Sequence, residues 1–270
     1  MTLRPSHPPR TVLLTSDERR HRYVAARVAQ DLAVVGIVAH PKPKPAPAAE
    51  PTTADAALLA DHFRGRGAAE AAILGDPPPL DATCPDLLRI PAADLNAPAT
   101  LAWVAARRPD VVLLYGTGIV GNGLLSAFPG RVVNLHLGLS PYYRGAGTNV
   151  WPLVRGEPWC VGYTIHLAVP AVDAGPVLVQ GRPAVEPADG PHEMGTRTIA
   201  AAAAALGPAV RAYLDGARAA VDQPPGGLVF RRRDFTADTV RAMRDRLAGG
   251  MVRRYCENRE ADDRRAPIVT

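Results

Sequence analysis

The sequence has little lysine, little cysteine and no long apolar run, and each shortage argues against a class of protein. Only Lys42 and Lys44 are lysines among the 31 basic residues, so the net charge of +5 comes from arginine. This fits a composition bias better than selection for an anionic partner. The three cysteines lie far apart without a Cys-x-x-Cys pair, which argues against a zinc site or a disulfide framework. Without a run of about 18 apolar residues, no membrane span is expected.

The N-terminal residues lack the apolar length of a secretory signal, and we therefore expect a cytoplasmic protein. What the sequence does contain is a regular alternation of short apolar runs and helical segments. It opens with a strand, a helix and a strand, which is the β–α–β unit of a parallel sheet. Strands are expected at 11–15, 33–39, 110–115, 131–136, 161–166 and 176–181, and helices at 17–31, 55–66, 98–108, 122–127, 149–155, 191–214 and from about 236.

These elements predict an α/β fold, with a Rossmann-like, doubly wound and mostly parallel sheet and a short, largely helical C-terminal extension. We divide the chain into a main domain over 1–215 and an extension over 216–270, where the composition changes at FRRRDF. The proline-rich segment 41–51 cannot hold a helix or a central strand, so a mobile surface loop is expected there.

A glycine-rich turn, GTGIVG, follows the strand 110–115 and superficially matches a dinucleotide-binding fingerprint, with Gly116, Gly118 and Gly121 as its glycines. Such a fingerprint belongs in the first strand–helix turn and is followed by an acidic residue about 20 positions later. Here the motif lies deep in the chain, and the next strand ends in Asn134 and His136 instead. Dinucleotide binding is therefore not expected.

The more informative segment is NLHLGLSPYYRGAGTNVWPL, residues 134–153. Asn134 and His136 lie two residues apart on a strand, so their side chains project to the same face. They also lie at the carboxyl end of the strand, where open α/β sheets bind ligands. Asp173 lies in a turn, VDAGP, between two apolar strands. Each feature alone has an ordinary explanation, either a satisfied strand-end histidine or the turn preference of Asp and Gly.

Together these features resemble the folate-dependent formyltransferase family, which includes glycinamide ribonucleotide, methionyl-tRNA and sugar-amine formyltransferases. The signature of that family is N-x-H, then a Ser-Pro loop ending in R-G, then a D-x-G turn. Here these are Asn134-Leu135-His136, residues 140–145 and Asp173-Ala174-Gly175. The resemblance covers residues 100–185 well, and it is strongest to enzymes that formylate a small-molecule amine.

The resemblance implies a catalytic triad of Asn134, His136 and Asp173. Asn134 would donate a hydrogen bond to the oxyanion formed when an amine attacks a formyl group, and His136 would hydrogen-bond or protonate it. Asp173 would hold His136 and collect the amine proton. The formyl donor would be 10-formyltetrahydrofolate, with no metal needed. The pterin is expected against Tyr115, Gly116, Thr117, Gly118, Ile119, Val120, Pro170, Ala171 and Val172. The amine is expected against Ser140, Tyr142, Tyr143, Arg144 and Gly145.

Departures from the family pattern narrow the range of possible acceptor amines. The loop after the first strand, SDERR, lacks the glycine-rich phosphate cradle of glycinamide ribonucleotide enzymes. The extension is expected to be too short and too helical for the β-barrel of initiator-tRNA enzymes. We therefore expect a small amine, such as an amino sugar nucleotide or a specialised-metabolite precursor, and no nucleic acid. The basic cluster Arg19, Arg20 and Arg22 either binds a phosphate or carboxylate at the helix start or forms a solvated helix face.

Two other functions stay open. Formyltetrahydrofolate hydrolases share the core and the triad, but they carry an N-terminal regulatory domain. In this sequence, too few residues precede the first expected strand to form such a domain. A non-catalytic folate-binding paralogue would be expected to lose a member of the triad, and all three are present. Arg144 either grips an acidic group of the substrate or braces its loop through backbone carbonyls. The oligomeric state is open, with a homodimer through the charged C-terminal helices as one option.

Overall fold

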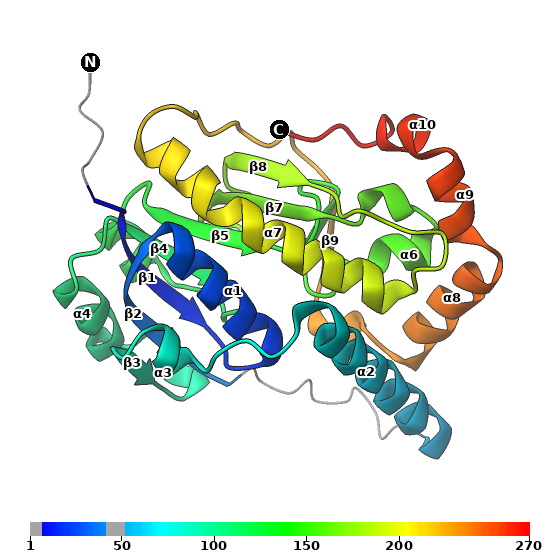
Figure 1. Ribbon diagram of the computed structural model, residues 1–270, viewed down its shortest axis with the longest axis horizontal. Helices are drawn as coiled ribbons and strands as arrows, with labels where there is room; N and C mark the ends of the chain where they lie inside the picture. The colour runs from blue at the N-terminus through cyan, green and yellow to red at the C-terminus, as the bar shows by residue number, and fades with distance from the viewer. Residues whose placement is uncertain (1–6, 42–51) are drawn as a thin grey trace.

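The computed structural model describes residues 7–41 and 52–270, so the proline-rich segment lies, apart from Pro41, outside the described residues (Figure 1). Seven strands form one sheet, in the spatial order β3 (Leu87–Arg89), β2 (Ala33–Ala39), β1 (Arg10–Thr15), β4 (Val111–Tyr115), β5 (Val132–His136), β7 (Tyr163–Leu167) and β8 (Val177–Gly181). The first five of these run parallel, whereas β7 runs antiparallel to both β5 and β8. The predicted Rossmann-like, mostly parallel sheet is therefore confirmed.

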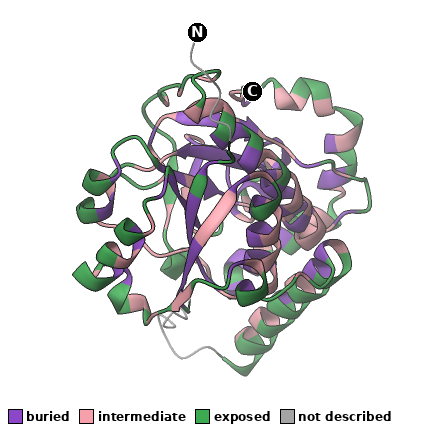
Figure 2. Cartoon of the chain, turned by 60° about the vertical axis from the view of Figure 1, so that its left-hand side comes forward, coloured by how far each residue is buried: buried purple, intermediate pink, exposed green. Residues whose placement is uncertain are grey.

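Helices cover both faces of the sheet because successive strand residues alternate between two apolar cores. Leu13 and Leu113 pack with α1 (Arg19–Asp31), α2 (Thr53–Leu74) and α7 (Pro191–Leu214). Val12 and Val112, one residue earlier on the same strands, pack with α4 (Pro98–Ala106) and α5 (Asn122–Ala127). Figure 2 shows the buried sheet between helices whose outer faces are exposed. This two-faced burial is what a doubly wound sheet requires.

The helix α2 is longer than predicted and continues through Gly65 and Gly67 to Leu74. Glycine costs about 1 kcal/mol per residue in a helix interior, so propensity alone favours an earlier end. Tertiary contacts outweigh that cost, because Leu74 is buried in the core and the buried Glu70 pairs with Arg20 at 3.0 Å. The shorter helices α3 (Leu80–Thr83) and α6 (Trp151–Arg155) lie in the connections.

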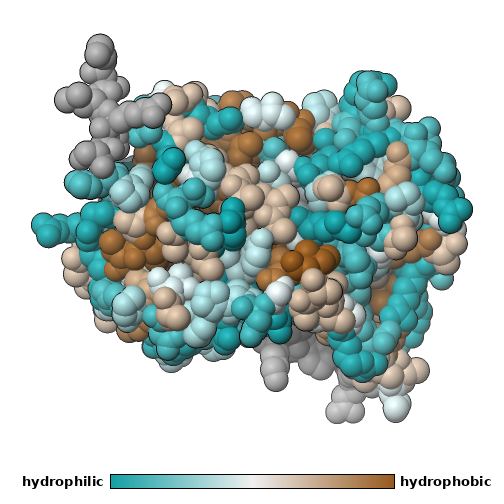
Figure 3. Space-filling model, viewed as in Figure 1, coloured by the Kyte–Doolittle hydropathy of each residue, from teal (hydrophilic) through white to brown (hydrophobic). Residues whose placement is uncertain are grey.

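The C-terminal residues form β9 (Leu228–Phe230), α8 (Ala237–Ala248), α9 (Met251–Glu257) and α10 (Arg259–Asp263). These helices follow one end of the molecule in Figure 1, and Figure 3 shows their outer surface as mostly hydrophilic. β9 pairs in parallel with β6 (Tyr143–Gly145), a short strand in the loop after β5. The chain end covers the edge strand β8, where the Gln180 N–H donates to the Val269 carbonyl at 2.7 Å. No helix within residues 7–41 and 52–270 is long and apolar enough to cross a membrane.

Candidate active site

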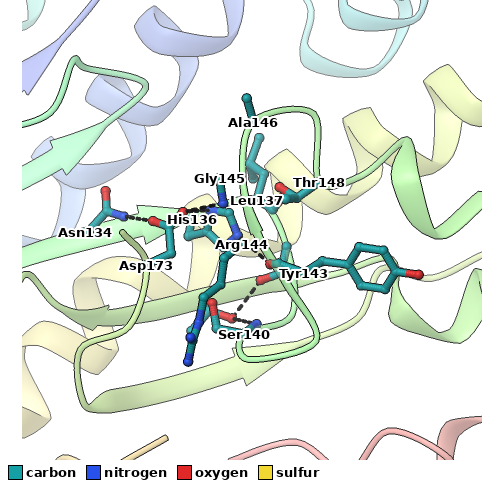
Figure 4. Close-up of polar contacts among 12 residues, drawn as sticks. Asn134, His136, Leu137, Ser140, Tyr143, Arg144, Gly145, Ala146, Thr148 and Asp173 are labelled. Carbon is teal, nitrogen blue, oxygen red and sulfur yellow. Dashed lines mark hydrogen bonds and ion pairs between the residues drawn. The ribbon is translucent and has the colours of Figure 1, made fainter. Parts of the chain in front are cut away.

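Asn134 and His136 lie at the carboxyl end of β5, and Asp173 reaches them from the turn between β7 and β8 (Figure 4). Oδ1 of Asp173 accepts a hydrogen bond from Nδ2 of Asn134 at 3.0 Å. Oδ2 lies 3.3 Å from Nδ1 of His136 and accepts a hydrogen bond from the Gly145 N–H at 2.8 Å. The structure therefore brings the three predicted triad residues together around one carboxylate.

Asp173 occupies an unusual backbone position and an enclosed side-chain position. Its φ of 48° lies in the left-handed region, which is uncommon for residues other than glycine. Its side chain is only 11% exposed. Burial alone would raise the pKa of Asp173, but the facing His136 and the hydrogen bond from the Gly145 N–H hold that pKa well below its ordinary value. Asp173 is therefore an anion at neutral pH.

His136 is buried, with a hydrogen-bond acceptor at each ring nitrogen. Its Nε2 lies 3.0 Å from the Tyr143 carbonyl oxygen, and its Nδ1 faces Asp173. Burial lowers the pKa of His136, and the charge of Asp173 opposes this shift. A neutral imidazole has a single N–H and can satisfy only one of the two acceptors. The second hydrogen bond forms only when the ring takes up a proton, so this position suits a group that exchanges protons.

His166 on β7 is a further member of the site that sequence reasoning missed. It is the cross-strand partner of Asn134, and its Nε2 lies 3.0 Å from Asn134 Nδ2 and 3.5 Å from Asp173 Oδ1. Its Nδ1 lies 2.8 Å from the Leu167 carbonyl, so the ring proton belongs on Nδ1 and Nε2 accepts from Asn134. This pairing could have been predicted only by assuming that the strand 161–166 runs antiparallel beside the strand 131–136.

Asn134 donates both hydrogens of its amide within the site, one to His166 and one to Asp173. The reverse orientation would place the amide oxygen against the carboxylate, so the hydrogen-bond network fixes the assignment. To donate to a substrate oxygen, as predicted, Asn134 must exchange one of these partners.

The first segment predicted to contact the pterin, 115–120, begins with the last residue of β4, at the same end of the sheet. His40 and Asn96, which sequence reasoning missed, hold it in place. Nε2 of His40 accepts from the Gly118 N–H at 3.2 Å and lies 2.8 Å from the Thr117 hydroxyl. Asn96 binds the Ile119 carbonyl at 3.0 Å and the N–H of the following glycine, Gly121, at 2.7 Å. The glycine-rich turn therefore has a fixed backbone.

Apolar side chains are exposed in both segments predicted to contact the pterin. Ile119 is 74% exposed and Val172 is 41% exposed, and Val169, just before the second predicted segment, is 36% exposed. Pro170 and Ala171 are exposed as well. The ring of Tyr115 is instead buried on the α1 face, with its centroid 5.3 Å from that of His21. Any contact between Tyr115 and this surface would involve its backbone.

The predicted amine-binding loop differs in exposure from residue to residue. Ser140 and Tyr143 are buried, whereas Tyr142, Arg144 and Gly145 are half-buried. The Tyr143 hydroxyl donates to Glu157, and its ring stacks on Phe230 of β9. The Tyr142 hydroxyl donates to the Pro267 carbonyl at 2.9 Å. Of the two aromatic rings, that of Tyr142 is thus the more accessible.

Arg144 has partners within the protein. It donates to Oε1 of Gln223 from Nη2 at 2.7 Å and from Nε at 3.2 Å, and to the Gly226 carbonyl at 3.2 Å. Figure 4 shows its side chain extending away from Asp173 and His136. This arrangement favours the bracing role over the gripping of a substrate acid.

The basic cluster on α1 is also paired with acids. Arg19 lies 3.4 Å from Asp76, Arg20 lies 3.0 Å from Glu70, and Arg22 lies 2.6 Å from Asp17. An incoming anion would therefore have to displace a carboxylate. Within the described part of the chain, no group of three or more His, Cys, Asp and Glu side chains is arranged to hold a metal ion.

The chain is similar to proteins of a known family and to several solved structures. The family model described as Formyl transferase matches residues 56–210, more than half of the chain, and this range contains the three triad residues. The chain also resembles crystal structures of glycinamide ribonucleotide transformylase 1 from Symbiobacterium toebii and a sugar N-formyltransferase from a Shewanella species. A third is a 4-N formyltransferase from Francisella tularensis.

The similarity to these structures is in fold more than in sequence. The Symbiobacterium enzyme is 20% identical, with a TM-score of 0.56 over 81% of this chain and 96% of that chain. The Shewanella enzyme is 18% identical, with a TM-score of 0.53 over 83% and 78%. The Francisella enzyme is 13% identical, with a TM-score of 0.54 over 85% and 79%. At these identities the matches establish the fold.

Proposed function

The chain belongs to the formyl transferase family, and we propose that it transfers a formyl group from 10-formyltetrahydrofolate to the amine of a small molecule. The observation that carries the proposal is the Asp173 carboxylate, which faces both Asn134 and His136 at 3.0 and 3.3 Å. The predicted division into a catalytic domain over 1–215 and an extension over 216–270 is part of the same proposal, as is a cytoplasmic location without a metal requirement.

The residues present fit a folate, whose bound form supplies an activated formyl carbon. The exposed side chains of Ile119, Val169 and Val172 offer an apolar surface to an aromatic pterin. Burying such side chains contributes roughly 25 cal/mol per Å² of apolar area removed from water. At Gly118 an added Cβ would meet Leu95 at 3.1 Å, so glycine at this position lets the turn pack against Leu95 and His40 and hold its backbone in place for a ligand.

In this proposal the catalytic steps belong to the three polar residues. His136 hydrogen-bonds or protonates the oxygen that becomes negative as the amine attacks, and Asn134 donates to the same oxygen. Each must first give up a present partner, since Asn134 donates to His166 and Asp173 and both ring nitrogens of His136 face acceptors. One such positioned donor lowers the barrier by about 3–4 kcal/mol. Asp173, ionised at neutral pH, keeps His136 in place and accepts the proton that the amine loses. The bond between the formyl carbon and N10 of the folate then breaks, and N10 takes up a proton as tetrahydrofolate leaves.

For the acceptor we propose an amino sugar nucleotide or a specialised-metabolite precursor. Two of the solved structures with this fold are named as a sugar N-formyltransferase and a 4-N formyltransferase. In this chain the β1–α1 loop contributes Asp17, which pairs with Arg22 and Arg89 at 2.6 Å each. A phosphate in this loop would have to displace the Asp17 carboxylate from both arginines, which argues against a ribonucleotide substrate with its phosphate there.

The test is to incubate the protein with 10-formyltetrahydrofolate alone and then with candidate amines. We expect turnover only when an amine is present. Release of formate without an amine would identify a hydrolase, and tight folate binding without either reaction would identify a binding protein. Methionyl initiator tRNA is expected not to be formylated, and its efficient formylation would contradict the proposed acceptor.

A second measurement addresses the glycine-rich turn. A reduced folate is expected to raise the melting temperature, because a ligand that binds only the folded state at 100 times its Kd stabilises it by about 2.7 kcal/mol. NAD and NADP are expected to cause no shift. Reproducible stabilisation by either dinucleotide at sub-millimolar concentration would overturn the interpretation of Gly116, Gly118 and Gly121.

A further inference from the structure

Gln223 connects two parts of the candidate site from outside the residues that match the family model. It lies in the segment between α7 and β9, and the match ends at residue 210. The backbone of Val221 exchanges two hydrogen bonds with Val177 at the start of β8, at 2.7 and 2.8 Å. This pairing fixes the segment beside the turn that carries Asp173.

The side-chain amide of Gln223 uses all of its usual hydrogen-bonding capacity. Its Nε2 donates to the carbonyl oxygens of Asp173 at 3.0 Å and Gly175 at 2.7 Å. Its Oε1 accepts the two bonds from Arg144 described above. The opposite amide orientation would place oxygen against two carbonyls and nitrogen against a guanidinium, so the assignment is unambiguous.

Gln223 joins the 173–175 turn to Arg144, and both of these parts help to determine where the Asp173 carboxylate lies. Asp173 holds a left-handed backbone conformation, which costs of order 1–3 kcal/mol unless its surroundings enforce it. The bond to its carbonyl supplies one such constraint. Arg144 immediately precedes Gly145, whose N–H donates to the carboxylate. One side chain therefore braces the turn and the loop that meet at this oxygen.

We infer that Gln223 is a positioning residue that fixes Asp173 against His136 by tying the 173–175 turn to Arg144. The expected effect on kcat rests on the proposed function, whereas the role of Gln223 in placing Asp173 rests on the contacts alone. Gln223 does not touch the reacting groups, so its loss should lower kcat more than it raises the KM for the amine.

The experiment compares Gln223→Met, which keeps the length of the side chain but removes both donors and the acceptor, with Asp222→Asn. Asp222 is the exposed neighbour on the same segment and serves as the matched control. We expect Q223M to lose about 10- to 100-fold in kcat, the range expected for a small misplacement of a catalytic group. D222N should match the wild type.

A second readout does not require activity. Burial and the charge of Arg144 lower the pKa of His136, as does His166 when it is protonated, whereas Asp173 and the Tyr143 carbonyl raise it. If Q223M moves the carboxylate away, the pKa of His136 followed by nitrogen-15 NMR should fall, in the same direction as in D173N. If Q223M does not fold, Gln223→Asn keeps an uncharged amide that is too short to bridge the turn and Arg144, and the same criteria apply.

The outcomes distinguish the proposed formyl transfer from the positioning role of Gln223. A wild-type protein that transfers no formyl group would refute the proposed function, while the NMR comparison would still test the role of Gln223. A folded variant with the wild-type kcat and an unchanged His136 titration would overturn the inference. A loss of kcat with a lowered His136 pKa, and an unchanged D222N control, would support it.

Discussion

Replacing Asp173 with asparagine is expected to lower kcat for formyl transfer by about 100-fold or more while the protein stays folded. The amide cannot take up the amine proton at neutral pH. It also offers one oxygen where the carboxylate offers two, so it cannot accept from both Asn134 and Gly145 while facing His136. Asparagine tolerates the left-handed backbone that Asp173 adopts, so the turn itself should survive.

The measurement is a comparison of kcat and KM for D173N and the wild type, with a thermal melt of each protein. Asp222→Asn makes the same chemical change at an exposed position of the segment that holds Gln223, and it should leave both quantities unchanged. Near-normal turnover by D173N at neutral pH would remove Asp173 from the mechanism.

Replacing Gly138 with alanine is the second change for which we expect a large effect. A Cβ at this position would lie 2.5 Å from Nε2 of His136 and 2.7 Å from the Cβ of Thr148, closer than real Cβ contacts allow. The His136 ring is held at both nitrogens and cannot yield without leaving Asp173 or the Tyr143 carbonyl. We expect kcat to fall by roughly 100-fold, since small displacements at a reacting centre have effects of that size.

The variant should still fold, because overpacking at one site typically costs about 1–3 kcal/mol, less than the roughly 5–15 kcal/mol by which native proteins are stable. Gly67→Ala is the matched control, since Gly67 is an exposed helical glycine with nothing within 4 Å of an added Cβ. It should keep full activity and gain about 0.5–1 kcal/mol. Wild-type kcat in a folded G138A would show that the position of His136 does not limit the reaction.

Local patterns were sufficient to predict most of the fold. The expected elements at 33–39, 122–127 and 191–214 coincide with β2, α5 and α7, because the period of apolar residues is a property of each segment alone. The two-residue spacing of Asn134 and His136 was likewise enough to place both side chains on one face of β5. Asp173 could be associated with them only through the family resemblance, because a turn aspartate by itself has an ordinary structural explanation.

The remainder of the site depends on pairs that are distant in sequence, which local periodicity cannot predict. The strands β6 and β9 have three residues each, too few to show an alternation, and they exist only because they pair with one another. His166 joins the site because β7 returns antiparallel beside β5, and Gln223 joins it because Val221 pairs with the start of β8. The sequence by itself therefore predicted the three candidate catalytic residues. The residues that hold them in place were decided by tertiary packing, since a hydrogen bond depends on the positions of both its donor and its acceptor.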